Sequence, residues 1–172
     1  MVFDAYGTLF DVHSVVEACE RQFPGHGIEL SRLWRQKQLE YSWLTTLMGG
    51  YEDFAKITRR ALSFALDSLR LAPGTSMVGS DLMAEYDRLK PFPEVPDTLA
   101  GLARTHRLAI LSNGTEAMLT EVLRHSGLSA RFEAVLSVDR IRRFKPVPEV
   151  YRMVSDLLRI APERAVFVSA NG

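Results

Sequence analysis

Short apolar runs alternate along this chain with longer stretches whose apolar positions recur at helical spacing. Four runs predict buried strands, at residues 1–4, 108–112, 134–137 and 165–169. Helical patterns cover residues 96–105, 116–126 and 148–158, and Thr115 is a suitable N-cap for the second of these. Strands that alternate with helices in this way predict an α/β fold with a parallel sheet.

The segment between the first two predicted strands carries four helical patterns and almost no strand signal. These patterns cover residues 12–23, 32–48, 51–69 and 80–89, with Ser31 as a plausible cap for the second, and Pro24-Gly25, Gly49-Gly50 and Pro73-Gly74 separate them. A direct crossover between parallel strands needs one helix rather than four. We therefore expect residues 13–91 to form an inserted helical cap, and residues 1–12 and 92–172 to form the core.

Composition narrows the class of protein. The 172 residues are 47% apolar, enough for a sizeable core, and Lys plus Arg balance Asp plus Glu at 21 each, which argues against a nucleic-acid partner. Cys19 is the single cysteine, so no internal disulfide or cysteine metal site is expected, and the four histidines lack metal-ligand spacing. Neither a membrane span nor a signal peptide is apparent, and we expect a soluble cytoplasmic protein.

Polar side chains occur where the predicted strands end. Asp4, Ser112 and Ser169 each fall at the end of a strand, and Lys145 lies in the loop before the last helix. Ligands of open parallel sheets bind beyond the carboxyl ends of the strands, so these positions should converge there beneath the helical cap. Taken alone, however, an Asp at a strand end most often caps a turn, and a Lys before a Pro is usually solvated.

Five sequence blocks together indicate a family. They are Asp4-Ala5-Tyr6-Gly7-Thr8, Leu33-Trp34-Arg35-Gln36-Lys37-Gln38-Leu39-Glu40-Tyr41, Leu111-Ser112-Asn113-Gly114, Lys145-Pro146 with Tyr151, and Ser169-Ala170-Asn171-Gly172. In this order they resemble the haloacid dehalogenase superfamily, in its (S)-2-haloacid dehalogenase branch. The resemblance implies a Rossmann-like core with a parallel sheet and a helical cap. Phosphate-transferring relatives have a second Asp where this chain has Tyr6.

The resemblance also implies a role for each candidate residue. Asp4 would be a nucleophile that forms a covalent ester, as carboxylates can, and Lys145 would keep it ionised. Arg35 would receive the departing halide, Ser112 would bind the substrate carboxylate, and Asn113 would lie near the halide.

Eight further assignments follow from the same resemblance. Thr8, Tyr151, Ser169 and Asn171 would orient Asp4, Lys145 and the hydrolytic water. Tyr6, Gln36, Leu39 and Phe54 would wall the alkyl group of the substrate, although ordinary packing explains Leu39 and Phe54 about equally well.

The implied reaction is the hydrolysis of short (S)-2-haloacids to (R)-2-hydroxy acids and halide, without a metal or cofactor. The alternatives are a magnesium-dependent phosphatase of the same superfamily, hydrolysis of another 2-substituted acid, and a non-catalytic remnant. The family continues past the last block with a further acidic residue, so we expect this chain to be truncated at its C-terminus, with the last part of the core missing. A stripe of Trp34, Tyr41, Trp43 and Leu47 would pack in the helical core or pair two subunits as a homodimer.

Overall fold

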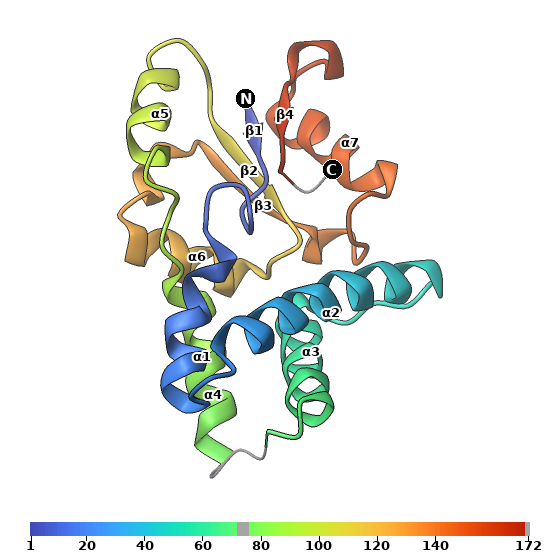
Figure 1. The fold of residues 1–172 in the computed structure, drawn as a ribbon. Coiled ribbons are helices and arrows are strands. Elements are labelled where there is room, and N and C mark those ends of the chain that lie inside the picture. Colours follow the sequence, from blue (N-terminus) through green and yellow to red (C-terminus); the bar gives the residue numbers. More distant parts are fainter. Residues whose placement is uncertain (72–75, 171–172) are drawn as a thin grey trace.

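The computed structural model describes residues 1–71 and 76–170, and it has a four-stranded parallel sheet (Figure 1). The strands are β1 (Val2–Phe3), β2 (Ala109–Ser112), β3 (Ala134–Ser137) and β4 (Phe167–Val168), in the order β3-β2-β1-β4. Each strand lies within a run that the sequence predicted, and every pairing is parallel. The prediction of an α/β fold with a parallel sheet is confirmed.

The connectivity reverses beside β1, and this places the site. The chain moves outward from β1 through β2 to β3, and then returns to β4 on the opposite side of β1. Because crossovers between parallel strands are right-handed, α5 (Val95–Leu102) and α6 (Glu116–Ser126) lie on one side of the sheet and α7 (Pro148–Leu158) on the other (Figure 1). The crevice for a ligand is therefore expected beyond the carboxyl ends of β1 and β4.

A group of helices lies beyond these strand ends (Figure 1). In chain order they are η1 (Val12–Val15), α1 (Val16–Gln22), α2 (Gly27–Leu47), α3 (Phe54–Ser68), α4 (Ser76–Glu85) and η2 (Tyr86–Arg88). Short 3₁₀ turns complete the core, at η3 (Ser129–Arg131), η4 (Val138–Arg140) and η5 (Pro162–Arg164). Within the described ranges, no helix has both the length and the apolar character needed to cross a membrane.

Two chain segments join this helical group to the sheet, and they run side by side. The Asp11 amide donates to the Lys90 carbonyl at 2.9 Å, and the Phe92 amide donates to the Leu9 carbonyl at 3.0 Å. Phe10 and Pro91 form an isolated antiparallel bridge between the same segments. We propose that residues 13–91 form a cap, that these two paired segments connect it to the core, and that residues 1–12 and 92–172 form the core.

Local hydrogen bonds explain where the helices begin. The predicted bounds of α6 and α7 agree with the structure, but α2 begins at Gly27, before the predicted start, so the assignment of Ser31 as its cap is wrong. The Glu20 carboxylate accepts hydrogen bonds from the amides of Gly25 and Gly27, at 2.6 and 2.9 Å, and so satisfies donors at the helix start. Asp53 caps α3 by accepting from the Lys56 amide at 2.8 Å. The Pro73-Gly74 breaker lies outside the described residues.

The cap of α6 yields a stability prediction. The Thr115 hydroxyl accepts a hydrogen bond from the Met118 amide at 3.2 Å, as the sequence predicted. Thr115→Ala should lower the free energy of unfolding by about 1 kcal/mol, measured by urea denaturation. Thr120→Ala within the same helix is the control, because its hydroxyl bonds only to the Glu116 carbonyl and alanine is the better helix former. Equal losses for the two variants would contradict this account of the cap.

Candidate active site

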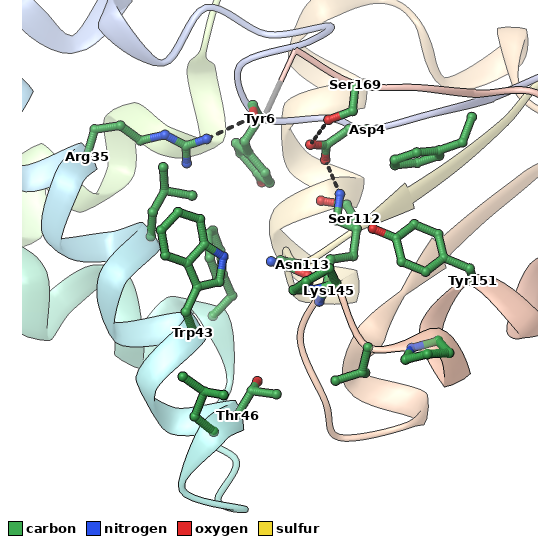
Figure 2. A pocket seen from close by; sticks show the side chains of 17 residues that line it. Asp4, Tyr6, Arg35, Trp43, Thr46, Ser112, Asn113, Lys145, Tyr151 and Ser169 are labelled. Carbon is green, nitrogen blue, oxygen red and sulfur yellow. Dashed lines mark hydrogen bonds and ion pairs between the residues drawn. The ribbon is translucent and has the colours of Figure 1, made fainter. Parts of the chain in front are cut away.

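Asp4 follows β1 directly, and both of its carboxylate oxygens are held (Figure 2). It is 5% exposed. Its Oδ1 accepts from the Ala5 amide at 2.8 Å and lies 2.6 Å from the Lys145 ammonium, and its Oδ2 accepts from the Ser169 hydroxyl at 3.3 Å. These contacts join the ends of β1 and β4 and the loop before α7, and they fix the direction in which the carboxylate points.

Lys145 is the cationic partner of Asp4 in this site. Its side chain is 12% exposed, and its ammonium also donates to the Leu111 carbonyl at 3.2 Å and lies 5.3 Å from the centre of the Phe167 ring. Burial lowers the pKa of Lys145 below its ordinary value of 10.5, while the negative charge of Asp4 acts in the opposite direction. The site therefore contains a buried ion pair close to the point where the sheet connectivity reverses.

The turn after β2 brings two polar side chains to the same place. The Ser112 hydroxyl accepts from the Gly114 amide at 3.1 Å, and the Asn113 carboxamide oxygen accepts from the Lys145 amide at 2.9 Å. A Cβ atom at Gly114 would lie only 2.6 Å from the Tyr6 ring, so a residue without a side chain is required there. The Ser112 hydroxyl proton and the Asn113 amide protons can therefore donate to a ligand in the cavity while their oxygens accept these bonds.

Arg35 reaches the cavity from α2 and is 8% exposed. Its guanidinium donates to the Gln38 carboxamide oxygen at 2.6 Å and to the Tyr6 carbonyl at 3.0 Å. Gln38 in turn donates to the Thr58 hydroxyl of α3 at 2.6 Å. Burial lowers the pKa of Arg35, and the negative charge of Asp4 partly opposes this shift. A positioned cation of this kind can stabilise an anion in the cavity.

The Tyr6 side chain is buried between the sheet and the helices. Its ring centre lies 5.9 Å from that of Phe54 and 6.2 Å from that of Tyr86. Burial raises the pKa of Tyr6, so the phenol stays neutral and supplies a wall rather than a charge. Over the described part of the chain, no group of three or more His, Cys, Asp or Glu side chains is arranged to hold a metal ion.

These groups share one cavity of about 650 Å³ (Figure 2). Ten of the predicted site residues line it: Asp4, Tyr6, Arg35, Leu39, Phe54, Ser112, Asn113, Lys145, Tyr151 and Ser169. The remaining lining was not assigned to the site from the sequence: Trp43, Thr46, Leu47, Pro146, Val147, Pro148 and Phe167. The first three follow Leu39 at helical spacing, and that signal was sufficient to find them. The polar groups are therefore set in a largely apolar enclosure.

Three predicted residues are not part of this lining. Gln36 is exposed and donates to Glu40 at 2.8 Å, so its prediction as a wall residue is wrong. It follows Arg35 by one position, which turns it about 100° around the helix and away from the cavity. Thr8 instead accepts from the Ala170 amide at 2.9 Å and ties the turn after β1 to the chain after β4. Asn171 lies outside the described residues.

Gln38 is a buried polar residue beside Arg35 that the sequence interpretation missed. It is fully buried and connects Arg35 to Thr58. Its position three residues after Arg35 on the same helix was the available signal, because side chains at that spacing are neighbours. Tyr151, which was predicted, packs its ring edge-on against Phe167 with ring centres 5.4 Å apart. Burial and the negative charge of Asp4 raise the pKa of Tyr151, so it too is a neutral phenol.

Comparison with known proteins places this geometry among a group of hydrolases. Residues 1–171 match the family model of haloacid dehalogenase-like hydrolases. The chain is 50% identical to the (S)-2-haloacid dehalogenase of Xanthobacter autotrophicus over 172 residues, which span all of this chain and 67% of that protein. The solved structure of the L-2-haloacid dehalogenase from the same organism superposes with a TM-score of 0.94 at 50% identity, covering 99% of this chain and 69% of that one. A second structure of that enzyme has chloropropionic acid covalently bound, and it also superposes with a TM-score of 0.94, at 49% identity and with the same coverage.

Proposed function

The chain belongs to the haloacid dehalogenase-like hydrolase family, and we propose that it hydrolyses short (S)-2-haloacids to (R)-2-hydroxy acids and halide. One observation carries the proposal. A buried carboxylate, Asp4, is paired with Lys145 at 2.6 Å and shares an apolar cavity with the Arg35 guanidinium. This arrangement suits the displacement of an anionic leaving group by an anionic nucleophile.

In the first step, an oxygen of Asp4 attacks C2 of the substrate from the side opposite the halogen. A C–O bond forms as the carbon–halogen bond breaks, the electron pair leaves with the halide, and the configuration at C2 inverts. The Ser112 hydroxyl binds the substrate carboxylate, and Arg35 and Asn113 receive the halide. The Lys145 ammonium keeps Asp4 ionised while Ser169 and the Ala5 amide hold its direction.

In the second step, water attacks the carbonyl carbon of the Asp4 ester and not the carbon of the substrate. The ester C–O bond breaks, one proton of the water passes to the departing oxygen, and the other is released to solvent. The hydroxy acid leaves with an oxygen that came from Asp4, and the carboxylate reforms with an oxygen from water. Tyr6, Leu39 and Phe54 wall the alkyl group and exclude other water molecules. Tyr151 and Ser169 orient Asp4, Lys145 and the hydrolytic water, and Thr8 holds the chain that carries Ser169.

Halide release tests this assignment directly. Purified protein should release chloride from (S)-2-chloropropionate and not from the (R) form, and a chelator should leave the rate unchanged. The product should be (R)-lactate by chiral chromatography. Magnesium-dependent release of phosphate from phosphate esters, with no release of chloride, would instead support a phosphatase. That result is not expected, because Tyr6 stands where a phosphatase of the superfamily has its second Asp.

Replacement of Arg35 should slow the departure of the halide. Arg35→Lys keeps a positive charge but loses the two-point contact with Gln38 and Tyr6. We expect a fall in kcat/KM on the order of 10²-fold for the 2-chloro substrate, and a smaller fall for the 2-iodo substrate, whose leaving group needs less stabilisation. The exposed Arg32 of the same helix supplies the control, Arg32→Lys. Equal losses for the two halides would exclude Arg35 from halide binding.

The end of α2 carries exposed apolar side chains, and we propose that it pairs two copies of the chain as a homodimer. Leu47 is 82% exposed and Met48 is 77% exposed, and Leu44 is also exposed. Leu44→Glu together with Met48→Glu should shift the sedimentation coefficient from dimer to monomer. We also propose a cytoplasmic location, which is consistent with Cys19 being the single cysteine of the chain.

A further inference from the structure

A side-chain hydrogen bond connects the loop between α2 and α3 to the core, and neither of its two residues lines the cavity. The Tyr51 hydroxyl donates a hydrogen bond to the Asp139 carboxylate. Tyr51 lies in the loop between α2 and α3, and Asp139 lies in η4, directly after β3. Both residues are half-buried. The Arg142 guanidinium also lies over the Tyr51 ring, 5.1 Å from its centre. The hydrogen bond therefore joins the α2–α3 loop to η4, where the segment that leads to Lys145 begins.

The residue before Lys145 is held by the same part of the helical group. Phe144 is fully buried, and its ring centre lies 5.2 Å from that of Tyr51 and 6.0 Å from that of Phe54. Its amide donates to the Thr46 hydroxyl of α2 at 3.2 Å. Contacts from α2, from the loop after it and from α3 thus converge on the residue next to the ammonium that pairs with Asp4.

We infer that Tyr51 and Asp139 are positioning residues that, through Phe144, hold residues 139–145 so that the Lys145 ammonium meets Asp4. This pair of residues is called the Tyr51–Asp139 latch below. A lysine side chain is long and flexible, so its head group is only as well placed as its backbone. An error of about 1 Å in the placement of a catalytic group can cost as much as 10²-fold in rate.

The ionisation of Tyr51 supports the direction of the hydrogen bond in the latch. Burial raises the pKa of Tyr51, and the bond to Asp139 and its negative charge raise it further. Because a phenolate could not donate, the raised pKa favours the neutral phenol as the donor in this hydrogen bond. The contact itself does not depend on the reaction, but its effect on rate rests on the proposed function.

The kinetic test compares four single variants and one double variant. Tyr51→Phe, which keeps the ring on Phe144, and Asp139→Ala should each lower kcat for (S)-2-chloropropionate by about tenfold, with KM changed by less than about twofold. Asp139→Asn should retain most of the activity, because an amide oxygen can accept the same hydrogen bond. The Tyr51→Phe/Asp139→Ala double variant should be no slower than either single one. Tyr41→Phe, a tyrosine on the α2 face that packs against Phe64, is the matched control.

A second readout needs no substrate and separates the latch from the proposed function. Lys145 should react slowly with an amine-reactive acetyl ester, because its side chain is buried in an ion pair, and mass spectrometry can follow it against the exposed Lys56 and Lys90. Tyr51→Phe and Asp139→Ala should accelerate labelling of Lys145 alone. Faster labelling in a protein that releases no halide would support the latch and overturn only the proposed function. Unchanged labelling and unchanged kcat in both folded variants would overturn the latch.

Discussion

Replacing Asp4 with asparagine is expected to abolish halide release, with a fall in kcat of at least about 10⁴-fold, as for other enzymes that lose their nucleophile. The carboxamide has nearly the same shape as the carboxylate, so its oxygen can still accept from the Ala5 amide while its NH2 group donates to the Ser169 hydroxyl oxygen. It has no negative charge with which to attack C2. The measurement is the initial rate of chloride release at saturating (S)-2-chloropropionate, with circular dichroism to establish that the variant is folded.

Asp156→Asn is the matched control for this experiment. Asp156 is an exposed residue of α7, so removal of its charge should leave kcat unchanged. A folded Asp4→Asn protein that retained more than about a tenth of the wild-type rate would show that water attacks the substrate without a covalent ester.

Replacing Lys145 with glutamine is the change with the next largest expected effect. The ammonium lies 2.6 Å from Asp4, and its loss leaves a buried carboxylate without its cation. We expect kcat/KM to fall on the order of 10²- to 10³-fold, because a preorganised charge in a dry site is removed. Lys56→Gln on the exposed surface of α3 should have no effect. A Lys145→Gln enzyme with near wild-type kcat/KM would exclude the lysine from the mechanism.

The pH dependence gives an independent check on Lys145. Burial lowers the pKa of Lys145 despite the opposing charge of Asp4, and the Arg35 cation lowers it further. As pH rises through this lowered pKa, the ammonium is lost, so kcat/KM should decline at a pH below the ordinary 10.5 of lysine. Lys145→Arg should lose this alkaline decline in whatever activity it keeps, because a guanidinium stays charged.

The lowered pKa of Lys145 affects stability in the opposite direction: as pH rises, kcat/KM should fall while the contribution of this group to the free energy of unfolding grows. Between the lowered pKa of folded Lys145 and the ordinary value, the unfolded chain binds more protons at this group than the folded chain does. The contribution of Lys145 to the free energy of unfolding therefore increases with pH across that window. If kcat/KM declines at alkaline pH while the protein stays folded, the decline comes from loss of the active-site ammonium and not from unfolding.

The sequence was sufficient to predict the fold and the polar centre of the site, because both depend on local patterns. Asp4, Ser112 and Ser169 each end an apolar run, and a parallel sheet brings the ends of such runs to one edge. The bounds of α6 and α7 were predicted correctly because their first turns carry a strong cap or an N-terminal proline, Thr115 and Pro148.

Features that depend on tertiary contacts were not predictable in the same way. The start of α2 is set by Glu20, a residue of the preceding helix whose carboxylate folds back onto two glycine amides. Gln36 and Gln38 are the same residue type two positions apart, and the rotation of α2 against the core buries Gln38 beside Arg35 while it leaves Gln36 exposed. The need for glycine at position 114 comes from the Tyr6 ring, which is remote in sequence.

The central claim is that Asp4 forms a covalent ester that water opens at the carboxyl carbon. The most direct test is one turnover with excess enzyme and (S)-2-chloropropionate in oxygen-18 water, followed by mass spectrometry of the Asp4 peptide and of the product. The account predicts heavy oxygen in Asp4 and none in the first molecules of lactate. Heavy oxygen in the lactate, with an unlabelled Asp4, would contradict it.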